Sequence, residues 1–127
     1  MANLLYQFAE CSNFLTHLNL RSLRPDGSRK RAVPYGYGFN WVSFPNYFFE
    51  ILGWVAFTVM TGSWASEESF PPTQTAHTLT GFRSGLLFLV VGSGTMALWA
   101  VQKHKKYKKE FGSAYPRNRK IIVPFVF

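Results

Sequence analysis

The sequence is poor in acidic residues and in cysteine. Its 127 residues include six Asp and Glu against 14 Lys and Arg, which gives a formal net charge of +8. A basic balance of this size is typical of proteins that bind nucleic acid, an anionic membrane face or phosphorylated ligands. The single cysteine, Cys11, excludes internal disulfides and a cysteine-based zinc site. We expect a buried, unreactive thiol, the alternative being a reactive one.

Several functional motifs are also missing. The chain has no Walker loop and no GxGxxG motif, so any dinucleotide site would not be a soluble Rossmann site. No metal site is expected, because His17, His77 and His104 are dispersed along the chain. A cleavable signal peptide is not expected either, since the first residues have no basic region followed by a long apolar run.

The first 31 residues combine an apolar segment with a basic one. Residues 1–20 predict a helix, but Glu10, Asn13 and His17 interrupt its apolar residues, so a full membrane span from Met1 is not expected. This segment is typical of the last turns of something longer, and we expect the chain to begin within a domain. In the basic stretch 20–31, a Pro-Asp-Gly turn at 25–27 predicts the end of the helix.

A Gly/Tyr-rich segment at 32–39 is predicted not to be helical. Its glycines, Gly36 and Gly38, would let backbone approach a partner closely, the alternative being an ordinary connecting loop.

Two apolar stretches follow, each near the length of about 20 residues that a helix needs to cross a bilayer. The first is residues 44–63, with Pro45 at the first helical position, and the second is residues 85–101. Gly92, Gly94 and Ala97 form a small-residue surface suited to close helix packing. Between the stretches, residues 65–84 predict an exposed polar loop and a possible insertion. The predicted fold is therefore an all-α integral membrane protein with two clear transmembrane helices and a partial N-terminal helix.

The charges predict the orientation of this hairpin. Both basic blocks, residues 21–31 and 103–120, flank its outer ends, whereas the joining loop carries Arg83 against Glu67 and Glu68. The positive-inside rule places both blocks, and hence the C-terminus, in the cytosol. Taken alone, the lysine run of residues 103–109 is typical of a stripe that faces lipid headgroups. Because it adjoins a membrane span, we expect no binding to nucleic acid.

A polar cluster lies at the start of the first apolar stretch. Asn46 and Glu50 are four residues apart and would share a helix face, with Tyr47 beside them. In an apolar site a phenol can donate a proton or stabilise a developing enolate, and an amide and a carboxylate suit ribose hydroxyls or a carboxamide. The alternative is that these groups only bond neighbouring helices.

Four ordered segments resemble the C-terminal half of the steroid 5α-reductase superfamily, most closely the very-long-chain trans-2-enoyl-CoA reductases of the endoplasmic reticulum. They are NFLTHLNLRSLRP (13–25), PYGYGFNWVSFPNYFFEILGW (34–54), GSGTMALWAVQKHKKYKKEF (92–111) and YPRNRKIIVPFVF (115–127). The resemblance implies that residues 1–127 are the C-terminal domain of a multi-span helix bundle. It also implies NADPH-dependent reduction of the trans-2 double bond of long-chain enoyl-CoA, in the endoplasmic reticulum membrane.

The same resemblance assigns roles to individual residues. Tyr47, in the Pro-Asn-Tyr element, matches the tyrosine that polarises the thioester carbonyl or protonates the enolate. The implied NADPH-binding residues are Asn13, Arg24, Asn46, Glu50 and Tyr107, with Arg21, His104 and Arg119 as weaker matches. Expected partners are an acyl-CoA substrate, membrane lipids and other fatty-acid elongation enzymes. The alternatives are a steroid or polyprenol 4-ene reductase and a truncated, non-catalytic membrane polypeptide.

Overall fold

The computed structural model describes residues 1–23, 32–63 and 72–127, with side chains from residue 80 onward in the last range. It contains the helices α1 (Ala2–Ser22), α2 (Pro45–Ser63) and α3 (Pro72–Phe111), followed by the short 3-10 helix η3 (Gly112–Ala114). No strand is present in these ranges, only an isolated β-bridge between Val42 and Lys120. The all-helical part of the predicted fold is confirmed.

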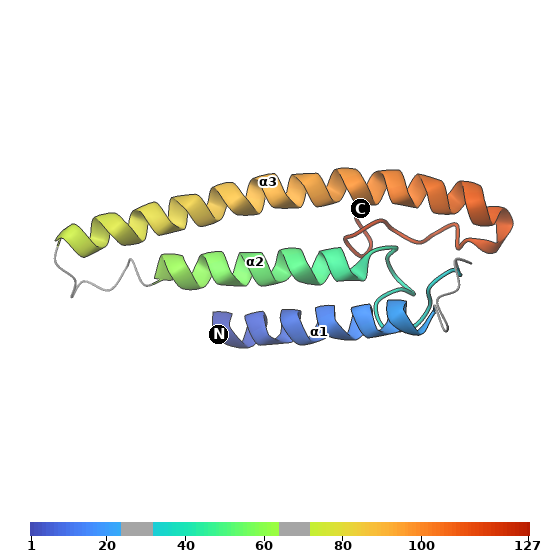
Figure 1. Ribbon diagram of the computed structural model, residues 1–127, viewed down its shortest axis with the longest axis horizontal. Helices are drawn as coiled ribbons and strands as arrows, with labels where there is room; N and C mark the ends of the chain where they lie inside the picture. The colour runs from blue at the N-terminus through green and yellow to red at the C-terminus, as the bar shows by residue number, and fades with distance from the viewer. Residues whose placement is uncertain (24–31, 64–71) are drawn as a thin grey trace.

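The three long helices lie side by side, with α2 between α1 and α3 (Figure 1). Helix α2 runs opposite to its two neighbours, so the C-terminal ends of α1 and α3 lie at the same end of the molecule as the N-terminus of α2. This arrangement brings the Pro45 end of α2 together with the basic ends of the other helices.

Helix α1 packs on α2 through small residues. Ala9, Ser12 and Thr16 are its buried positions, and their spacing of three and four places them on one helix face. Gly53 of α2 lies opposite Ala9, because a Cβ built at Gly53 would be 3.8 Å from the Ala9 Cβ. Cys11 is exposed, so the prediction of a buried thiol is wrong. The reason is helical periodicity, which turns Cys11 away from the face that contacts α2.

The segment between α1 and α2 depends on its glycines. Gly36 and Gly38 have φ values of 99° and 75°, in the left-handed region that side chains disfavour. A Cβ at Gly38 would lie 2.6 Å from the Pro45 Cβ, closer than a side chain can approach. The predicted non-helical segment with close backbone approach is thus confirmed, and its partner is the first residue of α2.

Helix α3 is longer than predicted and begins earlier. Its 40 residues start at Pro72, so residues 72–84 are helical where a polar loop was expected. Proline is tolerated at the first helical position, and the next possible helix breaker, Gly81, lies nine residues on. Residues 65–71 of the expected loop lie outside the described ranges. The lysine-rich segment at the other end is also part of α3, which spans about 60 Å.

One helix in the described ranges, at Thr80–Ala114, is long and apolar enough to cross a membrane. Helix α2 begins at Pro45 as predicted, but the polar residues of its first turns make it less apolar than is typical of a helix that crosses a membrane. Of the two transmembrane helices predicted, the described residues therefore show one. Trp54 of α2 lies against Gly92 of α3, as expected for close packing. A Cβ at Gly94 would meet nothing within 4 Å, so Gly94 does not take part in this contact.

After η3 the chain folds back towards the start of α2. The backbone N–H of Ser43 donates to Lys120 O at 2.8 Å, and that of Phe44 donates to Ile121 O at 3.0 Å. Behind this pairing, Phe44, Ala100 and Ile122 form a buried apolar cluster. The C-terminal segment therefore fixes the N-terminus of α2 against α3.

Candidate functional site

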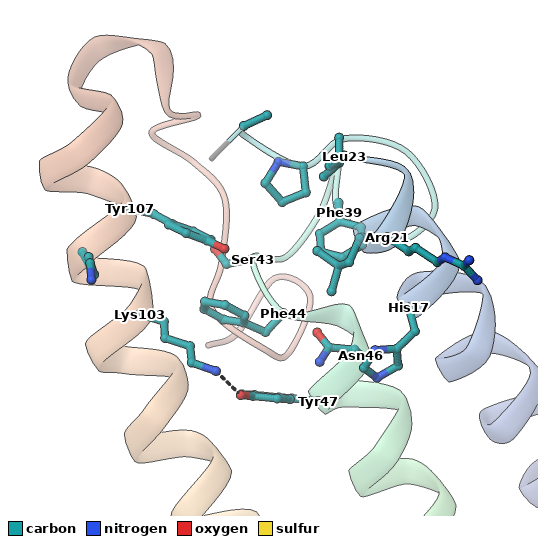
Figure 2. Close-up of a pocket in the computed structure, with 14 residues that line it drawn as sticks. His17, Arg21, Leu23, Phe39, Ser43, Phe44, Asn46, Tyr47, Lys103 and Tyr107 are labelled. Atoms are coloured by element: carbon teal, nitrogen blue, oxygen red, sulfur yellow. Dashed lines mark hydrogen bonds between the residues drawn. The ribbon is translucent and has the colours of Figure 1, made fainter. Parts of the chain in front are cut away.

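A cavity of about 580 Å³ lies at the end of the bundle where the basic segments meet. Its walls come from the last turns of α1, the following segment, the first turn of α2 and the lysine-rich end of α3 (Figure 2). The lining residues are His17, Leu20, Arg21, Leu23, Ala32, Pro34, Phe39, Ser43, Phe44, Asn46, Tyr47, Lys103, Lys106 and Tyr107. We call it the first cavity.

Tyr47 and Lys103 form a hydrogen bond across the first cavity. Lys103 Nζ donates to the Tyr47 hydroxyl oxygen at 2.6 Å (Figure 2). Because an ammonium group has no acceptor, the tyrosine keeps its own proton for another partner. The pair therefore presents a phenol whose proton is free for a ligand, with a positive charge beside its oxygen.

Aromatic packing holds this phenol in place. The Phe44 ring stacks on Tyr47, with centroids 5.6 Å apart, and on Tyr107, with centroids 5.8 Å apart. Phe44 itself is buried in the apolar cluster beside Ile122. Ring contacts of this kind contribute about 0.5–1.5 kcal/mol each and restrict ring orientation.

Asn46 adds a polar group that lacks a partner within the described chain. The residue is 7% exposed, lines the first cavity, and its Oδ1 is buried with no hydrogen bond. An unpartnered buried amide oxygen costs about 1–3 kcal/mol, unless a ligand supplies a donor. Asn46 is therefore suited to bind a hydroxyl or a carboxamide of a bound molecule.

Asn13 and Glu50 do not line the first cavity. Glu50 has His17 and Glu10 as its electrostatic neighbours, so it faces α1. Tyr47, in contrast, turns to Lys103 of α3. The three polar residues at the start of α2 thus divide between its two neighbouring helices.

His104 and Arg119 line a different cavity, of about 650 Å³, which we call the second cavity. Ser43 connects it to the first one, because its Oγ lies 2.7 Å from His104 Nδ1, 2.5 Å from the Tyr115 hydroxyl and 3.0 Å from Lys120 O. If the Ser43 hydroxyl donates to Lys120 O, its oxygen can accept hydrogen bonds from the Tyr115 hydroxyl and from the Nδ1–H of a neutral His104 imidazole. This arrangement satisfies all three contacts. This network holds the C-terminal segment against α3.

His104 lies beyond the apolar part of α3, among the lysines, and is 5% exposed. Burial lowers the pKa of His104 below its usual value of 6.5, and the nearby positive charges of Lys108 and Arg119 lower it further. The imidazole is therefore neutral at pH 7 and serves as a hydrogen-bonding group.

The predicted site residues are thus only partly brought together. The first cavity is lined by Arg21, Asn46, Tyr47 and Tyr107, whereas Arg24 lies outside the described residues. Sequence reasoning did not single out Lys103 as the partner of Tyr47. A signal was present, because Lys103 precedes Tyr107 by four residues and so shares its helix face.

The protein-family model described as 3-oxo-5-alpha-steroid 4-dehydrogenase matches residues 1–70 and 77–127. The chain belongs to this family. The match omits only residues 71–76, which lie within the segment considered a possible insertion.

Relatives in this family carry the names of two kinds of reductase. A Schizosaccharomyces pombe protein provisionally named an enoyl reductase is 52% identical over 94% of this chain and 34% of its own length. The very-long-chain enoyl-CoA reductase of Dictyostelium discoideum is 40% identical over 96% of the chain and 34% of its own length. A steroid 5-alpha-reductase of Solanum lycopersicum is 36% identical over 75% of the chain and 30% of its own length. The chain therefore spans about a third of the length of these family members.

Proposed function

We propose that this chain is the C-terminal part of an NADPH-dependent reductase that reduces the trans-2 double bond of long-chain enoyl-CoA in fatty-acid elongation. The observation that carries the proposal is the Tyr47 hydroxyl, which lines a basic cavity and accepts a hydrogen bond from Lys103. The names of the two relatives of highest identity among those described above support the acyl-CoA substrate.

The first cavity fits a phosphorylated dinucleotide such as NADPH in size and in chemistry. Its volume of about 580 Å³ lies within the usual range for cofactor sites, about 300–1,000 Å³. Arg21, Lys103 and Lys106 supply cations for phosphates, and the unpartnered Asn46 Oδ1 supplies an acceptor for a carboxamide or ribose donor. When bound, the cofactor supplies the hydride.

The tyrosine and lysine of the first cavity account for the remaining part of the reduction. Reduction of a trans-2-enoyl thioester adds a hydride at the β-carbon and a proton at the α-carbon, with negative charge developing on the thioester oxygen. The Tyr47 hydroxyl can donate a hydrogen bond to that oxygen or release the proton. Lys103 keeps a positive charge beside the phenolic oxygen as the proton leaves. Glu50 would act from the side of α2 that faces α1, as a positioning group beside His17, and Asn13 would act from α1.

A membrane location follows from the same proposal. The apolar residues 85–101, within the candidate span at Thr80–Ala114, would cross the bilayer. Helix α2 would be the second span, with its polar first turns facing protein. The basic ends of α1 and α3 would lie on the cytosolic side, which exposes the first cavity to a soluble cofactor. We propose the endoplasmic reticulum, with a cytosolic C-terminus and other elongation enzymes as partners.

Reduction of a 4-ene steroid or polyprenol is the second candidate. The steroid reductase from Solanum lycopersicum favours it, because it belongs to the same family and covers 75% of this chain. Its identity of 36%, against 52% and 40% for the enoyl reductases, ranks this candidate lower.

A chimeric enzyme tests the proposal. This chain would replace the matching C-terminal third of the Dictyostelium reductase, and turnover would be followed as loss of NADPH absorbance with a long-chain trans-2-enoyl-CoA. We expect activity from the chimera and about 100-fold less from its Tyr47→Phe variant, the lower end of typical losses for a general acid. Tyr35→Phe is the matched control, because Tyr35 is exposed and lines neither cavity.

Each result has a defined meaning. A Tyr47→Phe chimera at full rate would refute the catalytic assignment. A chimera that reduces a 4-ene steroid in preference to the enoyl-CoA would favour the second candidate. An inactive chimera that remains folded and binds NADPH would support a non-catalytic polypeptide.

A further inference from the structure

The second cavity lies on the side of α3 that faces away from the proposed cofactor site. Lys103, Lys106 and Tyr107 of α3 line the first cavity, whereas Lys105 and Lys108 line the second. Successive residues of an α-helix are turned by about 100°, so Lys105 lies about 200° around the helix from Lys103. A ligand of the second cavity would therefore not share the walls that α3 gives to the first.

The second cavity is strongly basic. Five cationic residues line it, and none of its described lining residues is acidic. The cationic residues are Lys105, Lys108, Arg117, Arg119 and Lys120. Such a set of donors is suited to a phosphate group.

Arg119, one of these five cationic residues, has a hydrogen-bond donor without an acceptor. The residue is 5% exposed, and its Nη1 donates to Pro34 O at 3.0 Å, yet its Nε is buried without a hydrogen bond. A buried guanidinium donor that lacks an acceptor is costly, and a phosphate oxygen would satisfy it.

An exposed apolar stripe on α3 leads directly into the second cavity. It consists of Leu87, Val90, Gly94, Leu98 and Val101, at spacings of three and four residues that place them on one helix face. Leu87, Val90 and Leu98 are each about two thirds exposed, and the space above Gly94 is open. Lys105 and Lys108 continue the same face, four and seven residues after Val101.

The apolar stripe is long enough to follow an acyl chain through one leaflet of a membrane and somewhat beyond it. From Leu87 to Val101 it extends about 21 Å at the helical rise of 1.5 Å per residue. One leaflet of a bilayer core is about 15 Å thick, half of the usual 30 Å. The stripe thus suits an acyl chain, and the cavity at its end suits the headgroup.

We propose that the second cavity binds the phosphate headgroup of an anionic phospholipid, whose acyl chain lies along the apolar stripe. A soluble nucleotide would use the cations but would leave the stripe uncovered. Apolar residues inside the cavity, Ile121, Val126 and Phe127, suit the glycerol and first methylene groups of a lipid.

Native mass spectrometry of the purified chain tests this proposal. The chain, in an uncharged detergent, would receive equal amounts of phosphatidylglycerol and phosphatidylcholine with identical acyl chains, and retained lipid would be counted. We expect preferential retention of phosphatidylglycerol. The Lys105→Gln/Lys108→Gln variant should bind it about 25-fold more weakly, at about five-fold for each lysine.

The matched control is Lys103→Gln/Lys106→Gln, which removes the same charge from the face of the first cavity and should retain the lipid. Equal losses in both variants would show charge attraction without a site, and equal retention of the two lipids would refute the headgroup assignment. Displacement of the lipid by millimolar inorganic phosphate would identify a free-phosphate site instead. If the Lys105/Lys108 variant loses helicity by circular dichroism, Arg117→Gln/Lys120→Gln outside the helix provides the same test.

Discussion

The hydroxyl of Tyr47 lies 2.6 Å from Nζ of Lys103, a residue 56 positions later in the chain. This contact joins the first turn of α2 to the basic end of α3 across the first cavity. It gives the lysine-rich segment a specific chemical role at one position, beyond the general attraction of basic residues to a membrane surface.

Replacing Lys103 should reduce turnover. In the chimeric enzyme, we expect Lys103→Gln to lower kcat about ten-fold, which corresponds to about 1.4 kcal/mol. This value is at the weak end for a charge-assisted hydrogen bond, because the bond between Lys103 and Tyr47 is exposed to solvent. The control is Lys109→Gln, which removes the same charge from α3 at a position that lines neither the first nor the second cavity. Steady-state kinetics of this variant should show little change in kcat. Equal effects of the two variants would mean that only overall charge matters.

Replacing Asn46 with leucine should change stability and cofactor binding in opposite directions. The variant removes a buried oxygen that lacks a partner, so we expect a gain of about 1 kcal/mol in the free energy of unfolding. It also removes an acceptor from the first cavity, so NADPH should bind about ten-fold more weakly. Thermal unfolding and a fluorescence titration of NADPH measure the two quantities. Unchanged NADPH affinity would remove Asn46 from the cofactor site, and exposed Asn118 is the control position.

Two glycines of α3 should respond differently to the same substitution. Gly92→Ala places a methyl group against the Trp54 ring, and we expect a loss of about 1–3 kcal/mol in the free energy of unfolding. Gly94→Ala meets nothing within 4 Å and should be neutral or stabilising, by up to about 1 kcal/mol from helix propensity. Unfolding in detergent, followed by circular dichroism, compares the pair. Similar effects at both positions would contradict the packing of α2 on α3 described here.

His104 should make stability depend on pH below its usual pKa of 6.5. Because burial lowers the pKa of His104 in the folded state, the unfolded chain binds the proton first, and stability is lost as pH falls from that value towards the lowered pKa. In His104→Gln this contribution disappears, so its unfolding temperature should fall less than that of the unchanged chain across the same range. Equal pH dependence of His104→Gln and the unchanged chain would contradict the prediction.

Much of the fold and the family could be predicted from the sequence, because these depend on local patterns. Apolar stretches and Pro45 predicted the helices, and glycines at 36 and 38 predicted the non-helical segment. Four ordered segments carried the family resemblance that the comparison confirmed. The early start of α3 at Pro72 was missed, because polar residues that lack an apolar period can still extend a helix.

The sequence by itself determined the helices, the basic character of their shared end and the residue types available for chemistry there. Only the tertiary structure decided which of those residues meet. Tyr47 and Asn46 are neighbours on one helix, yet one contacts α3 and the other is buried in the cavity wall, because adjacent helical residues point about 100° apart. His104 and Tyr107 likewise line different cavities. Ser43 meets His104 and Lys120 only because the C-terminal segment folds back on the start of α2, a contact between residues 77 positions apart that no local pattern encodes.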